Sequence, residues 1–201
     1  VSKLMHEMMQ SYLEHLYKPH ACDIKKSLFF YQNEQYGELY YYGFLKLLKH
    51  LNLSDKDHFL DVGCGLGKIV FQSFLTTMVA SASGIEINAL RYQIAIKVEE
   101  NIRQQLPDMF RQPRSLHMIH GDFLQHDFPN ITVIYLCSTV FSFDLLYAMS
   151  QKINAMSHVR RIASLRKLPN LSDFKLSKRI FLQADWERVP CYIYERNLNA
   201  E

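Results

Sequence analysis

The sequence predicts an α/β fold, in which a mostly parallel sheet of seven strands is covered by helices on both faces. Short apolar and β-branched runs alternate with longer helical patterns from residue 58 onward. The first run ends in a glycine-rich turn at 63–67, and the last two runs follow one another with no helix between them. Parallel neighbours need a helical crossover and antiparallel neighbours do not, so the last two runs predict a C-terminal antiparallel hairpin.

The predicted elements follow from apolar spacing and turn residues. Helical spacing predicts a helix over 2–18 that Pro19 helps to end, and a loop is expected from there to about residue 36. The other expected elements are helices over 39–51, 68–79, 88–105 and 143–156, strands over 58–62, 83–87, 115–120, 131–136 and 159–165, and an antiparallel pair over 179–184 and 190–195. We therefore expect an N-terminal helical segment, 1–35, followed by one α/β domain, 36–201.

Composition and charge exclude several classes of protein. Apolar residues make up 48% and charged residues 21% of the 201 residues, which excludes a disordered chain. The net charge of +3 is spread without a dense Lys/Arg stripe, so nucleic acid is not an expected partner. The longest apolar run, near 69–82, is interrupted by polar residues, so no membrane span is expected.

The cysteines indicate a reducing compartment. They are scattered singly, as Cys22, Cys64, Cys137 and Cys191. No CxxC pair, HExxH motif or Cys/His cluster is present, so neither a metal site nor a disulfide framework is expected. We expect a cytoplasmic protein, and export into another cell stays an open alternative because the chain starts at Val1.

The strongest local motif is Asp61-Val62-Gly63-Cys64-Gly65-Leu66-Gly67. A nicotinamide-binding fingerprint has its third glycine three places after the second, and Lys68 occupies that place here. No GK[ST] sequence follows, which disfavours a phosphate-binding P-loop. An acid followed by GxGxG instead resembles the first motif of class I methyltransferases, which bind S-adenosylmethionine (SAM). The alternative interpretation is a purely structural turn between strand and helix.

Further polar and aromatic residues follow the next strands. Glu86 ends the second strand and can accept both hydroxyls of a ribose. Asp122 and Phe123 follow the third strand, where Asp122 can accept from an adenine amino group and Phe123 can lie along the base. Taken alone, each has a simpler interpretation as a solvated acid, a helix cap or a core residue. Because ligands of parallel sheets bind at the carboxyl ends of the strands, we expect all three to converge on one site.

Three segments narrow the resemblance. They are Tyr36-Gly37-Glu38, Gly121-Asp122-Phe123-Leu124, and Trp186 followed by Val189-Pro190-Cys191-Tyr192-Ile193-Tyr194. Together they resemble the disruptor-of-telomeric-silencing family, the histone-lysine methyltransferases that lack a SET domain. The resemblance covers roughly residues 36–196, nearly the whole domain.

The resemblance implies a Rossmann-like class I methyltransferase fold, with 36–201 as the SAM-binding domain. It implies SAM as cofactor, S-adenosylhomocysteine as product, and transfer of a methyl group to a protein lysine amine. The implied cofactor-binding residues are Tyr36, Glu38, Asp61, Gly63, Gly65, Gly67, Glu86, Asp122, Phe123 and Ser138. The implied catalytic residues, which border the methionyl end of SAM and the target-lysine channel, are Tyr36, Phe141 and Trp186. Core packing is the alternative role for these three aromatic residues.

The chain also departs from the family pattern. Cys137-Ser138 stands where the family has an Asn-Asn pair after the fourth strand, and Arg166-Lys167-Leu168-Pro169 replaces a Lys-Pro-Phe segment. Serine replaces some of the polar contacts of asparagine and cysteine few. The family's long N-terminal region and a Lys-rich arm are absent from this sequence, which disfavours a histone and leaves other proteins equally open as the substrate.

Two other functions stay open at this point. A class I methyltransferase acting on RNA or a small molecule would share the cofactor residues, although no Asn-Pro-Pro-Tyr-type segment follows the fourth strand. A non-catalytic SAM-binding module would also share them, and the Cys137-Ser138 substitution gives that alternative some support.

Overall fold

This computed structural model describes residues 2–30, 38–111, 113–185 and 187–197, and strands and helices alternate in it between residues 58 and 164. In chain order the elements are α1 (Lys3–Tyr17), η1 (Lys18–His20), α2 (Ala21–Phe30), α3 (Tyr41–Leu51), β1 (His58–Val62), α4 (Lys68–Thr76), β2 (Ser81–Glu86), α5 (Ala89–Gln105), η2 (Pro107–Phe110), β3 (Ser115–His120), η3 (Phe123–Gln125), β4 (Val133–Leu136), α6 (Phe143–Ala155), β5 (Arg161–Ser164), β6 (Phe174–Gln183) and β7 (Arg188–Arg196).

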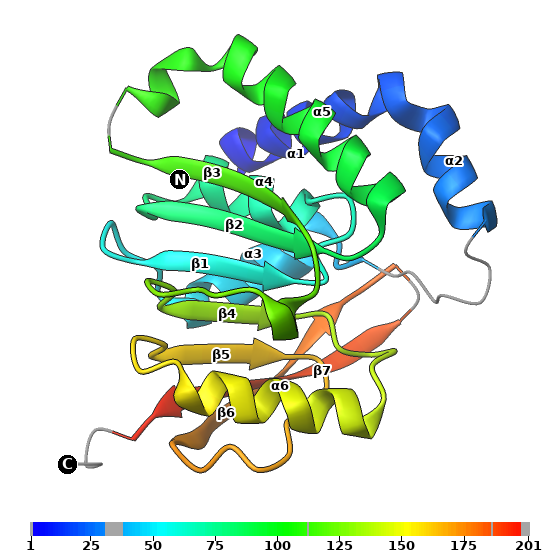
Figure 1. Cartoon of the computed structure of the whole chain (residues 1–201). Coiled ribbons are helices and arrows are strands. Elements are labelled where there is room, and N and C mark those ends of the chain that lie inside the picture. The colour runs from blue at the N-terminus through cyan, green and yellow to red at the C-terminus, as the bar shows by residue number, and fades with distance from the viewer. Residues whose placement is uncertain (1, 31–37, 112, 186, 198–201) are drawn as a thin grey trace.

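The strands form one seven-stranded sheet in the order β3-β2-β1-β4-β5-β7-β6 (Figure 1). β1 to β5 pair in parallel, whereas β7 is antiparallel to β5 and β6 is antiparallel to β7. The predicted α/β fold and its C-terminal hairpin are therefore confirmed. The strand order reverses between β1 and β4, and a crevice for ligands forms beyond the carboxyl ends of the strands at such a reversal.

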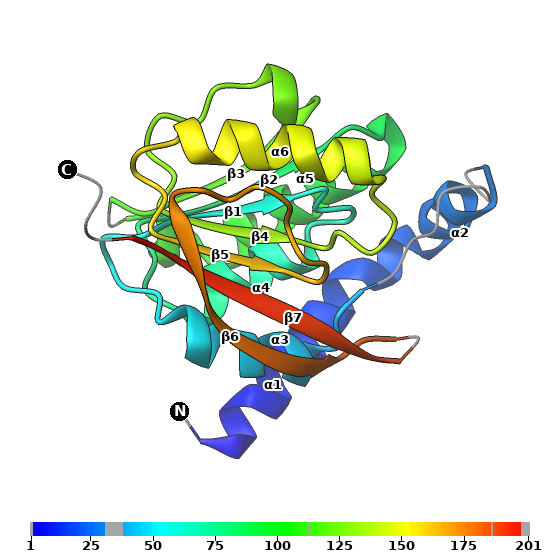
Figure 2. The same cartoon turned by 90° about the horizontal axis from the view of Figure 1, so that it is seen from below.

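Helices cover both faces of the sheet, as predicted. On one face, α1, α3, α4 and α5 contribute to a core with side chains such as Phe44, Phe71 and Val98. On the other face, α6 packs Leu146, Met149 and Ile153 against β1, β4 and β5, and Figure 2 shows α6 on the opposite side of the sheet from α1 and α3. β4 is buried along its whole length, which explains why its sequence is apolar on both faces.

The N-terminal region contains a helix that the sequence analysis expected to be a loop. Pro19 ends α1 but also lies at the start of the 3-10 turn η1, and α2 follows directly. Proline is tolerated in the first turn of a helix because its missing N–H would have no partner there. α2 packs against α5, where Lys97 Nζ lies 3.7 Å from Asp23 Oδ2, and α1 adds Leu16 and Tyr17 to the main core.

The edge strand β6 is longer than predicted, since it begins at Phe174 rather than near residue 179. Most side chains between Lys175 and Arg179 are exposed on both sides of this edge strand, so they carry no apolar alternation that would reveal a strand. The other boundaries shift by a few residues: β2 begins at Ser81 and β5 spans Arg161–Ser164. Among the described residues, no helix combines the length and the apolarity needed to cross a bilayer.

Candidate functional site

The glycine-rich turn after β1 builds the floor of the site. Gly63, Gly65 and Gly67 have φ angles of 72°, 56° and 81°, in the left-handed region that glycine adopts without strain. The amides of Gly63 and Cys64 both donate to the carbonyl of Ile85, at 2.9 and 3.1 Å, which holds the turn against the end of β2. A side chain at Gly63 would lie 3.2 Å from the ring of Phe141, so this ring packs closely over the turn.

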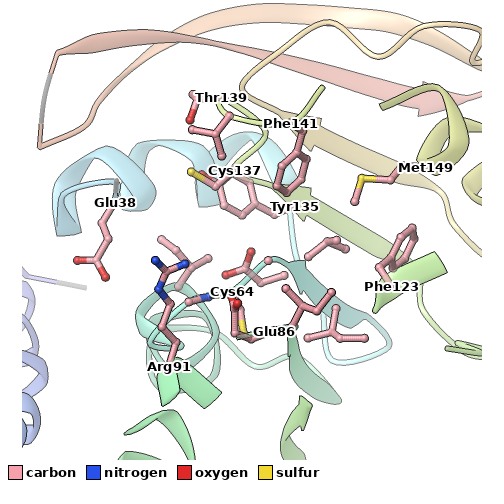
Figure 3. A pocket seen from close by; sticks show the side chains of 18 of the residues that line it. Glu38, Cys64, Glu86, Arg91, Phe123, Tyr135, Cys137, Thr139, Phe141 and Met149 are labelled. Atoms are coloured by element: carbon pink, nitrogen blue, oxygen red, sulfur yellow. Dashed lines mark hydrogen bonds between the residues drawn. The ribbon is translucent and has the colours of Figure 1, made fainter. Parts of the chain in front are cut away.

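A cavity of about 610 Å³ lies beside this turn, at the carboxyl ends of β1, β2 and β4. Eight residues that the sequence analysis assigned to the site line this cavity: Glu38, Asp61, Gly63, Gly65, Glu86, Asp122, Phe123 and Phe141. Figure 3 shows the charged side chains of Glu38 and Arg91 towards one end of the cavity. The apolar side chains of Phe123 and Met149 lie towards the other end. The cavity therefore has a charged end and an apolar end.

Glu86 holds the turn in place. Its Oε2 accepts from the backbone amide of Gly65 at 2.8 Å, and its Oε1 accepts from that of Asn88 at 2.8 Å. Two amide donors fix the orientation of this buried carboxylate. Each oxygen keeps a further lone pair, so Glu86 can still accept hydroxyl donors from a ligand.

Asp61 is buried in a different environment. Its side chain lies at 2% exposure, and its Oδ1 accepts no hydrogen bond from the described part of the chain. Burial raises the pKa of Asp61 well above its usual range, and the negative charges of Glu86 and Glu38 raise it further. An unsatisfied buried carboxylate next to two other acids fits a ligand that brings a positive charge or N–H donors.

The apolar end of the cavity is formed by the segment after β3. Asp122 Oδ1 caps the short turn η3 by accepting from the amide of Leu124 at 2.9 Å. Phe123 is buried, its ring stacks on Phe128 at 5.6 Å between centroids, and Lys152 Nζ lies 5.4 Å from its centre. The Phe123 ring is thus held rigidly as an apolar wall with an acid beside it, which suits a planar base carrying an amino group.

The structure does not bring every predicted residue to the cavity. Ser138 is fully buried, its hydroxyl lies 2.7 Å from that of Ser164, and it accepts from the amide of Arg166 at 3.0 Å. Its hydroxyl therefore joins the ends of β4 and β5, and Cys137 lines the cavity instead. Burial raises the pKa of the Cys137 thiol to about 12, so the thiol stays protonated at neutral pH.

Gly67 does not line the cavity either, and a side chain there would meet the ring of Phe71. Tyr36 and Trp186 lie outside the described residues.

The cavity also contains residues that the sequence analysis did not assign, among them Lys68, Arg91 and Tyr135. Lys68 Nζ forms an ion pair with the Glu38 carboxylate and lies 5.2 Å from the centre of the Tyr17 ring. Arg91 is buried in the first turn of α5, just beyond Glu86. The sequence position of both residues could have indicated this. Each lies in the first turn of the helix that comes next after a strand ending at the predicted site.

The tip of the β6–β7 hairpin contacts the segment that carries Glu38. The amide of Asp185 donates to the carbonyl of Glu38 at 3.0 Å, the amide of Glu38 donates to Asp185 Oδ1 at 3.1 Å, and the amide of Tyr40 donates to the carbonyl of Gln183 at 3.1 Å. These bonds join the hairpin to one wall of the cavity. In the described part of the chain, no cluster of three His, Cys, Asp or Glu side chains has the geometry of a metal site.

Comparison with known proteins finds a matching family and related sequences. A family model described as "Histone methylation protein DOT1" matches residues 14–182. The histone-lysine N-methyltransferase, H3 lysine-79 specific, of Caenorhabditis elegans is 22% identical over 156 residues, which are 75% of this chain and 16% of that protein. Its namesake in Drosophila melanogaster is 23% identical over 150 residues, 73% of this chain and 8% of that protein. The chain thus spans a small fraction of the length of these relatives.

Solved structures show the same architecture. An RNA methyltransferase from Salinibacter ruber, in complex with S-adenosyl-L-homocysteine, superimposes with a TM-score of 0.55 at 15% identity, covering 79% of this chain and 92% of that chain. At such low identity this similarity establishes the Rossmann-like methyltransferase fold alone.

Proposed function

We propose, from the premise that this chain belongs to the DOT1 family of histone methylation proteins, that it transfers a methyl group from SAM to the side-chain amine of a protein lysine. The observation that carries the proposal is that three acids converge on one cavity next to the GxGxG turn. Asp61 and Glu86 lie at the carboxyl ends of β1 and β2, and Asp122 follows the neighbouring strand β3. Family membership supplies the reaction, and the cavity supplies residues that fit the cofactor.

The two ends of the cavity match the two ends of SAM. Phe123 and Asp122 would hold the adenine base, and Glu86 would accept the ribose hydroxyls. Asp61, whose Oδ1 accepts no hydrogen bond from the described residues, would accept the methionyl ammonium group, with Glu38 close by. The bound cofactor supplies an electrophilic methyl group on a positively charged sulfur.

The protein's own contribution is chiefly positioning. Alignment of two reactants in one site can lower a barrier by about 7–11 kcal/mol. Phe141 lies against the glycine turn and would border the position of the reacting methyl group. We assign Tyr36 and Trp186 to the same region from the family resemblance.

The acceptor amine must lose its proton before it reacts, since the ordinary pKa of lysine is about 10.4. An aromatic, water-poor entrance disfavours the charged ammonium and so lowers that pKa. Phe141, and by resemblance Trp186, would provide this entrance. No side chain is assigned as a general base, and water can carry the proton away.

We propose a protein as the substrate and the cytoplasm as the location. The relatives are named for lysine 79 of histone H3, which supports a protein lysine as the acceptor class. Two of the four free cysteines, Cys64 and Cys191, are buried thiols, which is consistent with a reducing compartment.

The test is methyl transfer from radiolabelled SAM in bacterial and eukaryotic lysates, each with protease-treated and nuclease-treated controls. We expect a discrete labelled protein band with the wild-type chain and none with Glu86→Ala. Glu100→Ala is the matched control, because Glu100 is an exposed acid of α5 and its loss changes the charge equally.

Calorimetric titration with SAM accompanies the labelling. Loss of a charge-assisted acceptor costs about 1.5–3 kcal/mol, so Glu86→Ala should weaken SAM binding about ten- to hundredfold. Label that survives protease and disappears with nuclease would replace the proposal with RNA methylation. SAM binding with no label in any lysate would favour a non-catalytic module.

A further inference from the structure

One face of the β6–β7 hairpin combines exposed basic and aromatic side chains. Strand pairing places Arg179 opposite Tyr192, Phe181 opposite Pro190 and Gln183 opposite Arg188. Alternate residues of a strand share a face, so Arg179, Phe181, Arg188, Pro190 and Tyr192 lie together on what we call the hairpin face. The opposite face carries Leu182, Val189, Cys191 and Ile193, which are buried against the core that includes α3.

The hairpin face is held together by contacts between its own members. The Arg179 guanidinium lies 5.0 Å from the centre of the Phe181 ring and 5.6 Å from that of Tyr192, and Arg188 lies 5.9 Å from Phe181. Phe181 is nevertheless 42% exposed. Rings that align two guanidinium groups while keeping them at the surface preorganise a cationic site.

Neither guanidinium is neutralised by an acid in the described parts of the chain. The salt bridges and side-chain hydrogen bonds found there involve neither Arg179 nor Arg188. Two acids of the same hairpin are engaged elsewhere, since Glu195 pairs with Arg161 at 2.8 Å and Asp185 accepts from the amide of Glu38. The face therefore presents uncompensated positive charge to solvent.

This face adjoins the proposed active site. Tyr192 packs against the same hydrophobic cluster as Phe141, which lines the cavity, so the two lie on the same side of the sheet. The hairpin tip is hydrogen-bonded to the 38–40 segment at the cavity wall. In Figure 1 the tip lies at the end of the molecule where the parallel strands end.

We infer that the hairpin face docks an acidic segment of the protein substrate, which brings a lysine near that segment to the cavity. The inference rests on the proposed function and adds the class of substrate. Arginine forks pair bidentately with carboxylates, and the exposed ring of Phe181 covers the apolar part of an extended peptide. A nucleic acid backbone would need several further phosphate contacts, whereas Lys178 lies on the opposite face, where it adjoins His50 and Lys46.

Fluorescence anisotropy with the full chain tests this. The probes are labelled short peptides that carry one central lysine flanked either by glutamates or by glutamines, and a single-stranded RNA of similar charge. We expect the glutamate peptide to bind more tightly than the glutamine peptide. Arg179→Gln/Arg188→Gln should weaken the glutamate peptide about tenfold and leave the glutamine peptide unchanged, as loss of two carboxylate pairs implies.

Lys49→Gln/Lys56→Gln is the matched control, because it removes the same charge from exposed positions outside the hairpin. An equal loss in this control, or no preference for the glutamate peptide, would overturn the inference. So would RNA that binds more tightly than the glutamate peptide and is lost in Arg179→Gln/Arg188→Gln.

The docking inference and the proposed function can fail independently of each other in these experiments. SAM calorimetry should give the same affinity for Arg179→Gln/Arg188→Gln as for the wild type, which also shows that the variant is folded. A wild-type chain that labels a lysate protein while this double variant labels it equally well would overturn the docking inference and leave the methyltransferase proposal intact. Absence of SAM binding by the wild type would contradict the proposed function, and the peptide arm would still decide the docking inference.

Discussion

At the level of single residues, the two central carboxylates of the site, Glu86 and Asp61, differ in their hydrogen bonds. Both oxygens of Glu86 accept a backbone amide, whereas Asp61 Oδ1 accepts none from the described residues. Burial and the charges of Glu86 and Glu38 hold the pKa of Asp61 above its usual range. The ligand-free site therefore favours a protonated Asp61, and a positively charged ligand would favour its ionised form.

Proton release on SAM binding follows from this situation. At a pH between the ordinary and the raised pKa, Asp61 is mostly protonated in the ligand-free fold, and a nearby positive charge favours the ionised form. We expect SAM binding to release protons, detected as a binding enthalpy that changes with the ionisation enthalpy of the buffer. Asp61→Asn should abolish that buffer dependence, and its persistence in this variant would assign the protons to another group.

Asp61→Asn should also stabilise the ligand-free chain at neutral pH. A carboxyl whose folded pKa is raised contributes its stability below the unfolded pKa and loses it as pH rises through the folded pKa. Urea unfolding at neutral pH should therefore show Asp61→Asn to be more stable than the wild type, with the difference vanishing near the ordinary pKa of Asp. Asp55→Asn, at an exposed position, should show no such gain.

The strand-end positions were predictable from sequence, but the orientation of Ser138 was not. Asp61 and Glu86 lie at the carboxyl ends of recognisable strands and Asp122 follows another, and parallel topology alone brings these ends together. After β4, one of the consecutive residues Cys137 and Ser138 can face the cavity. β4 is buried on both faces, so its sequence carries no alternation that would reveal which one.

Among the elements of the sheet, the amino ends of β1, β4 and β5 are held together by Asp57. These ends lie opposite the site. The Asp57 carboxylate accepts from Arg160 Nε and Nη2 at 2.7 Å, from Ser54 at 2.8 Å and from the Thr132 hydroxyl at 2.8 Å. These bonds join the loops that precede β1, β4 and β5. Burial alone would raise the pKa of Asp57, but the hydrogen bonds outweigh it and hold this pKa well below the usual range.

Asp57→Asn should destabilise the fold by about 1.5–3 kcal/mol, since it weakens charge-assisted hydrogen bonds between the buried Asp57 and Arg160, whose side chain is 38% exposed. Because the folded pKa is lowered, the contribution of Asp57 is present above its unfolded pKa and is lost as pH falls below it. Urea unfolding of wild type and variant should differ most at neutral pH and converge in acid. A difference that stays constant with pH would show that the charge of Asp57 is not the cause.

Helices and strands that bury one apolar face were predictable from the sequence. The helix α2 and the first half of β6 were not. The helices and strands between β1 and α6 alternate as expected because each buries at least one face. α2 was missed because Pro19 indicates a helix end from one side and a helix start from the other. The first half of β6 was missed because an edge strand exposed on both sides has no apolar period.

For the molecule as a whole, cofactor binding should increase the free energy of unfolding. A ligand at about a hundred times its Kd stabilises the folded state by about 2.7 kcal/mol. For a chain of this size that corresponds to a rise in Tm of roughly 5–10 °C. Thermal unfolding with and without SAM measures the rise, which Glu86→Ala should largely remove while Glu100→Ala keeps it.

The most direct test of the central claim is the identity of the methylated amino acid. A protein labelled by this chain and radiolabelled SAM is hydrolysed to amino acids and separated alongside methylated standards. The account predicts that the label co-elutes with methylated lysine and is absent when Glu86→Ala replaces the wild type. Label that co-elutes with methylated arginine or histidine, or that is lost to base as a methyl ester, would contradict lysine methylation and leave only a SAM-dependent transferase of another specificity.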